Sequence, residues 1–305
     1  MVEIGYKRAV WGAEDHLCKI YPGTRMGMNL SYMDVGNQEV VGWAIGAYPS
    51  VSFLLGKDYK KPRLRIGAGL GYVQKPFDQD NNVTNIAIGS YLNALVNFSI
   101  EGNWYINENH LKYGFSFTHY SNAAFSAPNL GLNIPTLYLG YSFISNYRSG
   151  PDVEDDVESI TLMTEWEWRR NHELLGTVGW RENSLHNPKK YAAGSLGYQY
   201  LHQFSHKLAW SAGADFFFNP SLQTESDASN HDLNWMQAGA YAGLEVLFNN
   251  HSMYVQQGVY LFSPYKGNGW KYNRLGYRYR FENGIIAGIS LKSHLAVAEY
   301  FHFDL

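Results

Sequence analysis

The chain has 305 residues, of which 45% are hydrophobic, 16% aromatic and 17% charged, and its formal net charge is −3. Soluble domains usually carry about a quarter charged residues, so this chain is poor in charge. The slightly acidic balance excludes the basic surface of a nucleic-acid-binding protein. The single cysteine, Cys18, excludes an intrachain disulfide and a thiolate metal cluster.

The sequence shows neither a transmembrane helix nor a signal peptide. No apolar segment approaches the roughly 18 residues that a transmembrane helix requires. The first ten residues, "MVEIGYKRAV", lack the basic start and the apolar core of a signal peptide. If the protein is exported, we therefore expect this chain to be its mature form.

Alternation of apolar residues with small or polar ones runs along the chain and predicts β-strands, because residues two apart share one face of a strand. The first clear run is "RMGMNLSYM" (25–33), followed by "LRIGAGLGY" (64–72) and "LKYGFSFTHYS" (111–121). The second half repeats the pattern in "LAWSAGADFFF" (208–218) and "LGYRYRFE" (275–282). Tight turns rich in Gly, Asn, Asp and Pro separate the runs. Longer loops such as "QKPFDQDNNVTN" (74–85) are expected to be flexible.

The polar faces of these strands favour one of two architectures. A soluble sandwich or barrel turns its apolar faces inward, whereas a transmembrane barrel turns them toward lipid and places aromatic residues at both interfaces. The polar faces here carry many Gly and Ser residues and charges of both signs, unlike a soluble exterior. We therefore predict an all-β, transmembrane, antiparallel up-and-down β-barrel of about 14 strands, within a range of about 12 to 16. A soluble all-β protein that binds sugar is the alternative.

The stretch "FTHYSNAAFSAPNLGLN" (117–133) carries the candidate chemistry. His119 and Ser121 share one face of a predicted strand, and their Cα atoms are expected to lie about 6.5–7 Å apart. A serine needs such a base, because its hydroxyl is a weak nucleophile. Parity along the next strand places Asn133 on the same face, where its amide is expected to orient the imidazole.

Donors for an oxyanion are expected in the same stretch. They are the side-chain amides of Asn122 and Asn129 and the backbone N–H groups near Ala123 and Ala124. By itself, an H-x-S sequence on a strand is a weak motif, and a histidine at a strand end usually has no catalytic role.

The segment "HYSNAAFSAPNLGLN" (119–133) resembles the signature of the bacterial outer-membrane lipid A 3-O-deacylases (PagL type), also called acyloxyacyl hydrolases. The resemblance extends over about residues 2–145 and is closest to Bacteroidetes-like versions. It implies a catalytic base at His119, a nucleophile at Ser121 and an oxyanion donor at Asn129. The family's usual third member is a Glu twelve residues after the Ser, where this chain has Asn133. That departure removes the negative charge that stabilises an imidazolium.

We predict a single outer-membrane barrel over residues 1–305, with a deacylase-like half (1–146) that carries the site and additional strands over 157–305. An open half-barrel would leave unpaired strand edges in lipid, which is not tolerated. Two separate small barrels are the lesser alternative. In the second half, Arg274, Arg278, Arg280 and Glu282 are expected to form an ion-pair network that plugs the bore.

The predicted function is a serine ester hydrolase that removes an acyl chain from lipid A of lipopolysaccharide, with its Ser-His pair on the lipid-facing wall. The alternative is a non-enzymatic structural or transport barrel with a degenerate site. The expected partners are lipid A and outer-membrane lipids, and the oligomeric state is left open. No cofactor is expected. No metal site is expected either, because the acidic run "PDVEDDVE" (151–158) lacks the spacing of a calcium loop.

Overall fold

In the part of the chain that the computed structural model describes, the regular secondary structure is antiparallel β-strand apart from one short 3-10 helix. None of the helices in the described residues is long and apolar enough to cross a membrane. Cys18 and the acidic run 151–158 lie outside the described residues. The structure describes residues 1–9, 21, 23–56, 61–106, 109–143, 169–182, 189–225, 232–248, 250–294 and 297–305.

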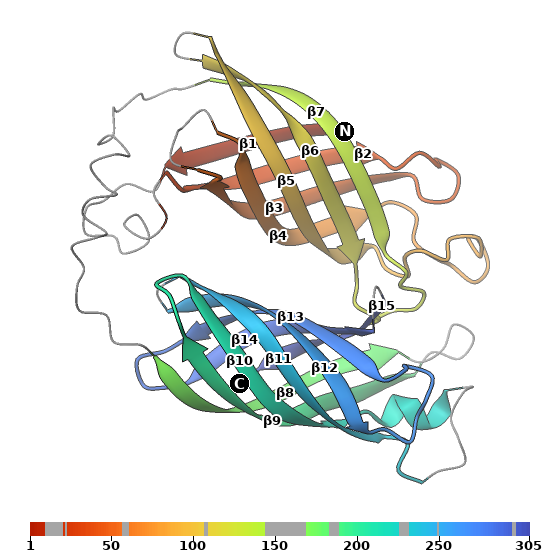
Figure 1. The fold of residues 1–305 in the computed structure, drawn as a ribbon. Coiled ribbons are helices and arrows are strands. Elements are labelled where there is room, and N and C mark those ends of the chain that lie inside the picture. The colour runs from red at the N-terminus through yellow and green to blue at the C-terminus, as the bar shows by residue number, and fades with distance from the viewer. Residues whose placement is uncertain are drawn as a thin grey trace. The chain divides into compact units, whose positions relative to one another are not determined.

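The strands form two hydrogen-bonded sheets (Figure 1). Strands of the first sheet pair in chain order, and strands of the second close into an eight-stranded barrel when β15 pairs with β8. The first sheet contains β1 (Val2–Ala9), β2 (Arg25–Asp34), β3 (Trp43–Leu54), β4 (Arg63–Val73), β5 (Leu92–Ile106), β6 (Asn109–Ser121) and β7 (Leu132–Ser142). The barrel contains β8 (Arg170–Glu182), β9 (Lys190–Gln203), β10 (Leu208–Phe218), β11 (Met236–Phe248), β12 (His251–Phe262), β13 (Lys271–Arg280), β14 (Ile286–His294) and β15 (Val297–Asp304), with η1 (Pro220–Thr224) after β10.

The all-β antiparallel barrel class predicted from the sequence is confirmed, and the strands described fall within the expected range. The expected single barrel over residues 1–305 differs from the observed pairing. The second half closes on itself between β15 and β8, so it has no place for strands of the first half. The chain likewise divides into two compact units, Met1–Asn122 with Gly131–Trp166 and Ala123–Leu130 with Glu167–Leu305.

The first sheet has an apolar exposed face and a polar buried face, the reverse of a soluble protein. On β2, Met28 and Leu30 are each 55% exposed, whereas Asn29 and Ser31 between them are each 1% exposed. On β4, Arg65 is 2% exposed and forms a 3.3 Å ion pair with Glu101 of β5. Apolar side chains outside and polar ones inside are the pattern of a barrel wall in lipid.

An apolar cluster lies inside the first sheet, next to the end of β6. Tyr120 is fully buried in this cluster together with Leu95 and Ile88. Its ring lies directly against the backbone of Gly71, where an added Cβ would come within 2.3 Å of the Tyr120 Cε1 atom. Because neighbouring residues of a strand point to opposite faces, the inward anchoring of Tyr120 turns His119 and Ser121 to the other face.

Ion pairs fill the interior of the closed barrel, as the sequence predicted. Arg274 pairs with Asp215 at 2.5 Å, and Arg278 lies 3.5 Å from a carboxylate oxygen of Glu245. Glu282, expected to be part of this network, is instead exposed on the turn after β13. The observed partners come from other strands across the lumen. The alternation of residues within one strand does not predict which residues face each other across the lumen.

Substitution of Asp215 by Ala is expected to lower the free energy of unfolding of the barrel by roughly 3–5 kcal/mol, because it leaves the Arg274 guanidinium buried without its carboxylate. Glu282→Ala removes an exposed carboxylate and should change stability by less than about 0.5 kcal/mol. Urea titration of the protein in phospholipid vesicles, followed by tryptophan fluorescence, measures both. An equal effect of the two variants would show that the Arg274 pair does not stabilise the barrel.

Candidate functional site

His119 and Asn133 face each other across β6 and β7 in the first sheet. They are directly opposed in the antiparallel register, and His119 Nδ1 lies 2.7 Å from Asn133 Oδ1. An amide oxygen only accepts hydrogen bonds, so the proton sits on Nδ1 and Nε2 is left as the basic nitrogen of the ring. The predicted proximity of these two residues is therefore present, with the tautomer that a general base requires.

Ser121 is the last residue of β6 and shares the parity of His119. Its partner in the register is Ala94 of β5, while Val96 is opposite His119. Apolar side chains continue the same face along neighbouring strands, among them Phe115 at 45% and Leu137 at 83% exposure. The serine and the histidine therefore lie at one end of an apolar strip of the sheet, where Ser121 is 5% exposed.

The connection after Ser121 leaves the strand through an uncommon backbone conformation. Ala123 and Ala124 have φ values of 49° and 60°, in the left-handed region that alanine seldom adopts. Residues held there cost about 1–3 kcal/mol each and are frequent at functional sites. The peptide bond between Ala127 and Pro128 is cis. Asn129 follows in the same connection, so all of the predicted donors lie between β6 and β7.

Two loop residues that the sequence did not single out contact this region. Ser90, at the end of the loop between β4 and β5, accepts a 2.8 Å hydrogen bond from Asn122 Nδ2. Gly131, with φ +77°, lies against His119, because an added Cβ would be 2.6 Å from the Cε1 atom of the imidazole. The segment 119–133 contained this glycine, but only the folded loop shows that its backbone lies against the histidine.

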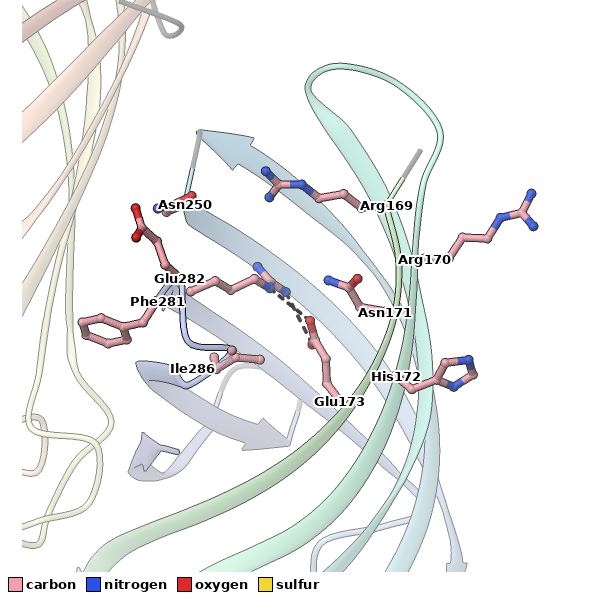
Figure 2. Close-up of a pocket in the computed structure, with 11 residues that line it drawn as sticks. Arg169, Arg170, Asn171, His172, Glu173, Asn250, Phe281, Glu282 and Ile286 are labelled. Carbon is pink, nitrogen blue, oxygen red and sulfur yellow. Dashed lines mark hydrogen bonds and ion pairs between the residues drawn. The ribbon is translucent and has the colours of Figure 1, made fainter. Parts of the chain in front are cut away.

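A hollow lies at one end of the closed barrel and has a volume of about 570 Å³ (Figure 2). Its inner wall carries Arg280, which pairs with Glu173 at 3.0 Å and with Glu245 at 3.1 Å. Arg170 and His172 also border the hollow, but Figure 2 shows them pointing to the opposite side of β8 from Glu173. The Arg280 charge inside the hollow is paired with carboxylates, and no serine is among the described residues that line it. His119, Ser121 and Asn133, by contrast, lie on strands of the first sheet.

Metal-binding clusters are absent from the described part of the chain, where no three His, Cys, Asp or Glu side chains are arranged to hold an ion.

Two family models match the chain and together span most of it. The first, described as "Lipid A 3-O-deacylase (PagL)", matches residues 2–142. The second, described as "Acyloxyacyl hydrolase, C-terminal domain", matches residues 170–305. The chain belongs to the lipid A 3-O-deacylase (PagL) family. A search of curated proteins gave no match.

The family boundaries coincide with the two sheets. The deacylase match begins with the first residue of β1 and ends with the last residue of β7, and the C-terminal match begins with the first residue of β8. The resemblance inferred from residues 119–133 is thus confirmed, together with its extended second half. The family is one of ester hydrolases that remove an acyl chain from lipid A, and the barrel architecture fits the outer membrane.

Proposed function

We propose that this chain hydrolyses an acyl ester of lipid A with Ser121 as nucleophile, His119 as general base and Asn133 as the residue that orients the imidazole. The observation that carries the proposal is the 2.7 Å hydrogen bond between His119 Nδ1 and Asn133 Oδ1. This bond fixes the ring two residues from Ser121 on the same strand, with the basic Nε2 available for the serine proton.

The first half of the reaction acylates the enzyme. Nε2 of His119 takes the hydroxyl proton as Ser121 Oγ attacks the ester carbonyl carbon, and the carbonyl oxygen gains the negative charge. Amide donors of Asn122 and Asn129 and the backbone N–H groups of Ala123 and Ala124 stabilise this oxyanion. The intermediate collapses when the bond to the sugar oxygen breaks and His119 returns its proton to that oxygen, which releases a hydroxyl on the sugar.

The second half of the reaction restores the serine. His119 takes a proton from water, the hydroxide attacks the acyl-serine, and the proton passes to Ser121 Oγ as the fatty acid leaves. The apolar strip that contains Phe115 and Leu137 supports a substrate whose acyl chain lies along the wall. No other group is needed to balance either step.

Mass spectrometry of lipid A tests the proposal against a non-enzymatic barrel. Cells with complete lipid A that express the chain in their outer membrane are expected to accumulate a species lighter by one acyl chain and to release the corresponding fatty acid. Cells that carry the empty vector provide the comparison. If lipid A is unchanged although the folded protein is present in the outer membrane, the chain is a structural or transport barrel.

A further inference from the structure

The loop between β4 and β5, residues 74–91, is held in place by its own side-chain amides. Asn85 is 1% exposed, donates a 2.6 Å hydrogen bond to the carbonyl oxygen of Lys75, and accepts bonds from the backbone N–H groups of Ala87 and Ile88 at 3.1 and 3.2 Å. Ile88 is fully buried in the apolar cluster beside Tyr120. The loop expected to be flexible is therefore anchored at a defined position.

This loop contacts both ends of the connection between β6 and β7. The backbone N–H of Gly131 donates a 2.9 Å hydrogen bond to the carbonyl oxygen of Ala87. At the other end, Asn122 Nδ2 donates to Ser90 Oγ, which in turn donates to Asn93 Oδ1 at 2.9 Å. One contact therefore acts just after the serine, and the other acts just before the strand that carries Asn133.

Each of these two contacts positions a residue that takes part in the proposed reaction or lies against one. Gly131 lies against the edge of the His119 ring that carries Nε2, since an added Cβ would be 2.6 Å from Cε1 and 3.3 Å from Nε2. Asn133 holds the opposite nitrogen of the same ring. The imidazole is thus confined by Gly131 on one side and by Asn133 on the other. The carbonyl of Ala87 fixes the position of Gly131 through its hydrogen bond.

Asn122 is affected in a similar way. A primary amide carries two N–H hydrogens, and the bond to Ser90 uses one of them and fixes the plane of the group. Preorganised donors stabilise an oxyanion because they need no reorientation when the charge develops.

We infer that Asn85 and Ser90 are positioning residues of the hydrolytic site: Asn85 places the Ala87 carbonyl that holds Gly131 against His119, and Ser90 orients the Asn122 amide. The inference rests on the proposed function. Neither residue touches the reacting atoms. A displacement of about 1 Å far from the chemistry can cost about a hundredfold in rate, which is why such supports matter.

The same loop contains a matched control for Asn85. Asp78 Oδ1 accepts hydrogen bonds from the N–H groups of Asp80 and Asn81 at 3.0 and 2.8 Å, two and three residues on, as Asn85 does with Ala87 and Ile88. Backbone N–H bonds from Asn81 and Asp80 lower the pKa of the Asp78 carboxyl. The bonds from Asp78 stay within its own turn, so it provides the same kind of turn without a link to Gly131.

The test measures kcat and KM of the full chain in detergent micelles with purified lipid A, and the rate at which a fluorophosphonate labels Ser121. Asn85→Ala is expected to lower kcat and the labelling rate at least about tenfold and to change KM less than about threefold, because alignment and not substrate binding is lost. Asp78→Ala should leave all three within about twofold. Ser90→Ala should lower kcat about tenfold, and Ser90→Thr should restore most of it because it keeps the hydroxyl.

Folding is followed in the same samples by the shift in electrophoretic mobility on heating, and Ser90 provides an independent measurement if Asn85→Ala does not fold. Equal effects of Asn85→Ala and Asp78→Ala, or equal effects of Ser90→Ala and Ser90→Thr, would overturn the inference. An active wild type that loses activity with Ser121→Ala would leave the proposed function standing in that case. An inactive wild type would overturn both.

Discussion

Substitution of Ser121 by Ala is expected to lower kcat/KM for lipid A at least about 10³-fold, equivalent to roughly 4 kcal/mol of transition-state stabilisation. Without the hydroxyl there is no acyl-enzyme, and the oxyanion donors alone leave a small residual rate. His119→Ala should cause a loss of similar size, because the serine is a weak nucleophile without its base. Release of fatty acid from purified lipid A by protein in micelles provides the measurement.

The double variant separates a catalytic pair from two independent contributions. Residues that act as a unit are strongly non-additive, so Ser121→Ala with His119→Ala should be no slower than either single variant. Ser116→Ala is the control on the same strand, because Ser116 is fully buried on the opposite face of β6. Retention of activity by Ser121→Ala within about tenfold of the wild type would place the nucleophile elsewhere.

Parity along a strand was sufficient to place His119 and Asn133 together. Alternation assigns every residue of a strand to one of two faces, and a shift of one residue would have moved the whole apolar set of β6 to the wrong face. The antiparallel pairing of β6 with β7 then brings residues that are directly opposed in the register into contact, as for His119 and Asn133. This part of the site could therefore be predicted from the sequence.

Strand closure could not be predicted in the same way. Alternation determines which face of β15 is buried, but it does not determine which strand β15 pairs with. The pattern therefore did not distinguish pairing with β8 from pairing with a strand of the first half. The same limit applies to the barrel interior. The inward position of Arg274 was evident, whereas its partner Asp215 comes from β10 across the lumen.

The loop residues of the site were missed for a different reason. Asn82 and Asn85 occur in a polar segment, and polar composition suggests flexibility unless the hydrogen-bonding partners of the amides are known. Asn82 reaches the carbonyl oxygens of Val40 and Pro76 at 2.9 and 2.8 Å. A buried amide of this kind stabilises one loop conformation, so the support of the site became visible only in the fold.

Restoring a carboxylate at position 133 is expected to increase the activity of this chain. A hydrogen bond to a charged acceptor is roughly twice as strong as one to a neutral acceptor, and the Asn133 side chain already lies 2.7 Å from His119 Nδ1. A negative charge there stabilises the imidazolium that forms in the transition state, which the amide oxygen does only weakly. Asn133→Glu should therefore raise kcat about tenfold, or roughly 1.4 kcal/mol.

Three variants at this position separate charge from geometry. Asn133→Gln has the length of the glutamate without its charge and should not exceed the wild-type kcat. Asn133→Leu removes the acceptor, leaves the imidazole tautomer unconstrained, and should lower kcat about a hundredfold. These rates are compared for each variant in micelles and in vesicles of lipid A, because Asn133 is exposed in the structure and its surroundings determine how strongly a charge is screened.

The order of these variants distinguishes an adapted site from a degenerate one. If kcat is higher with glutamate than with asparagine at position 133, and higher with asparagine than with leucine, the amide is a hydrogen-bond acceptor in an active site whose rate is lower than a carboxylate would give. If glutamate gives no gain while leucine loses activity, the site is adapted to a neutral acceptor, and the oxyanion donors held by Ser90 and the β6–β7 connection supply the greater part of the stabilisation. Equal rates for asparagine and leucine would show that position 133 does not orient His119, and the base would then need a different partner.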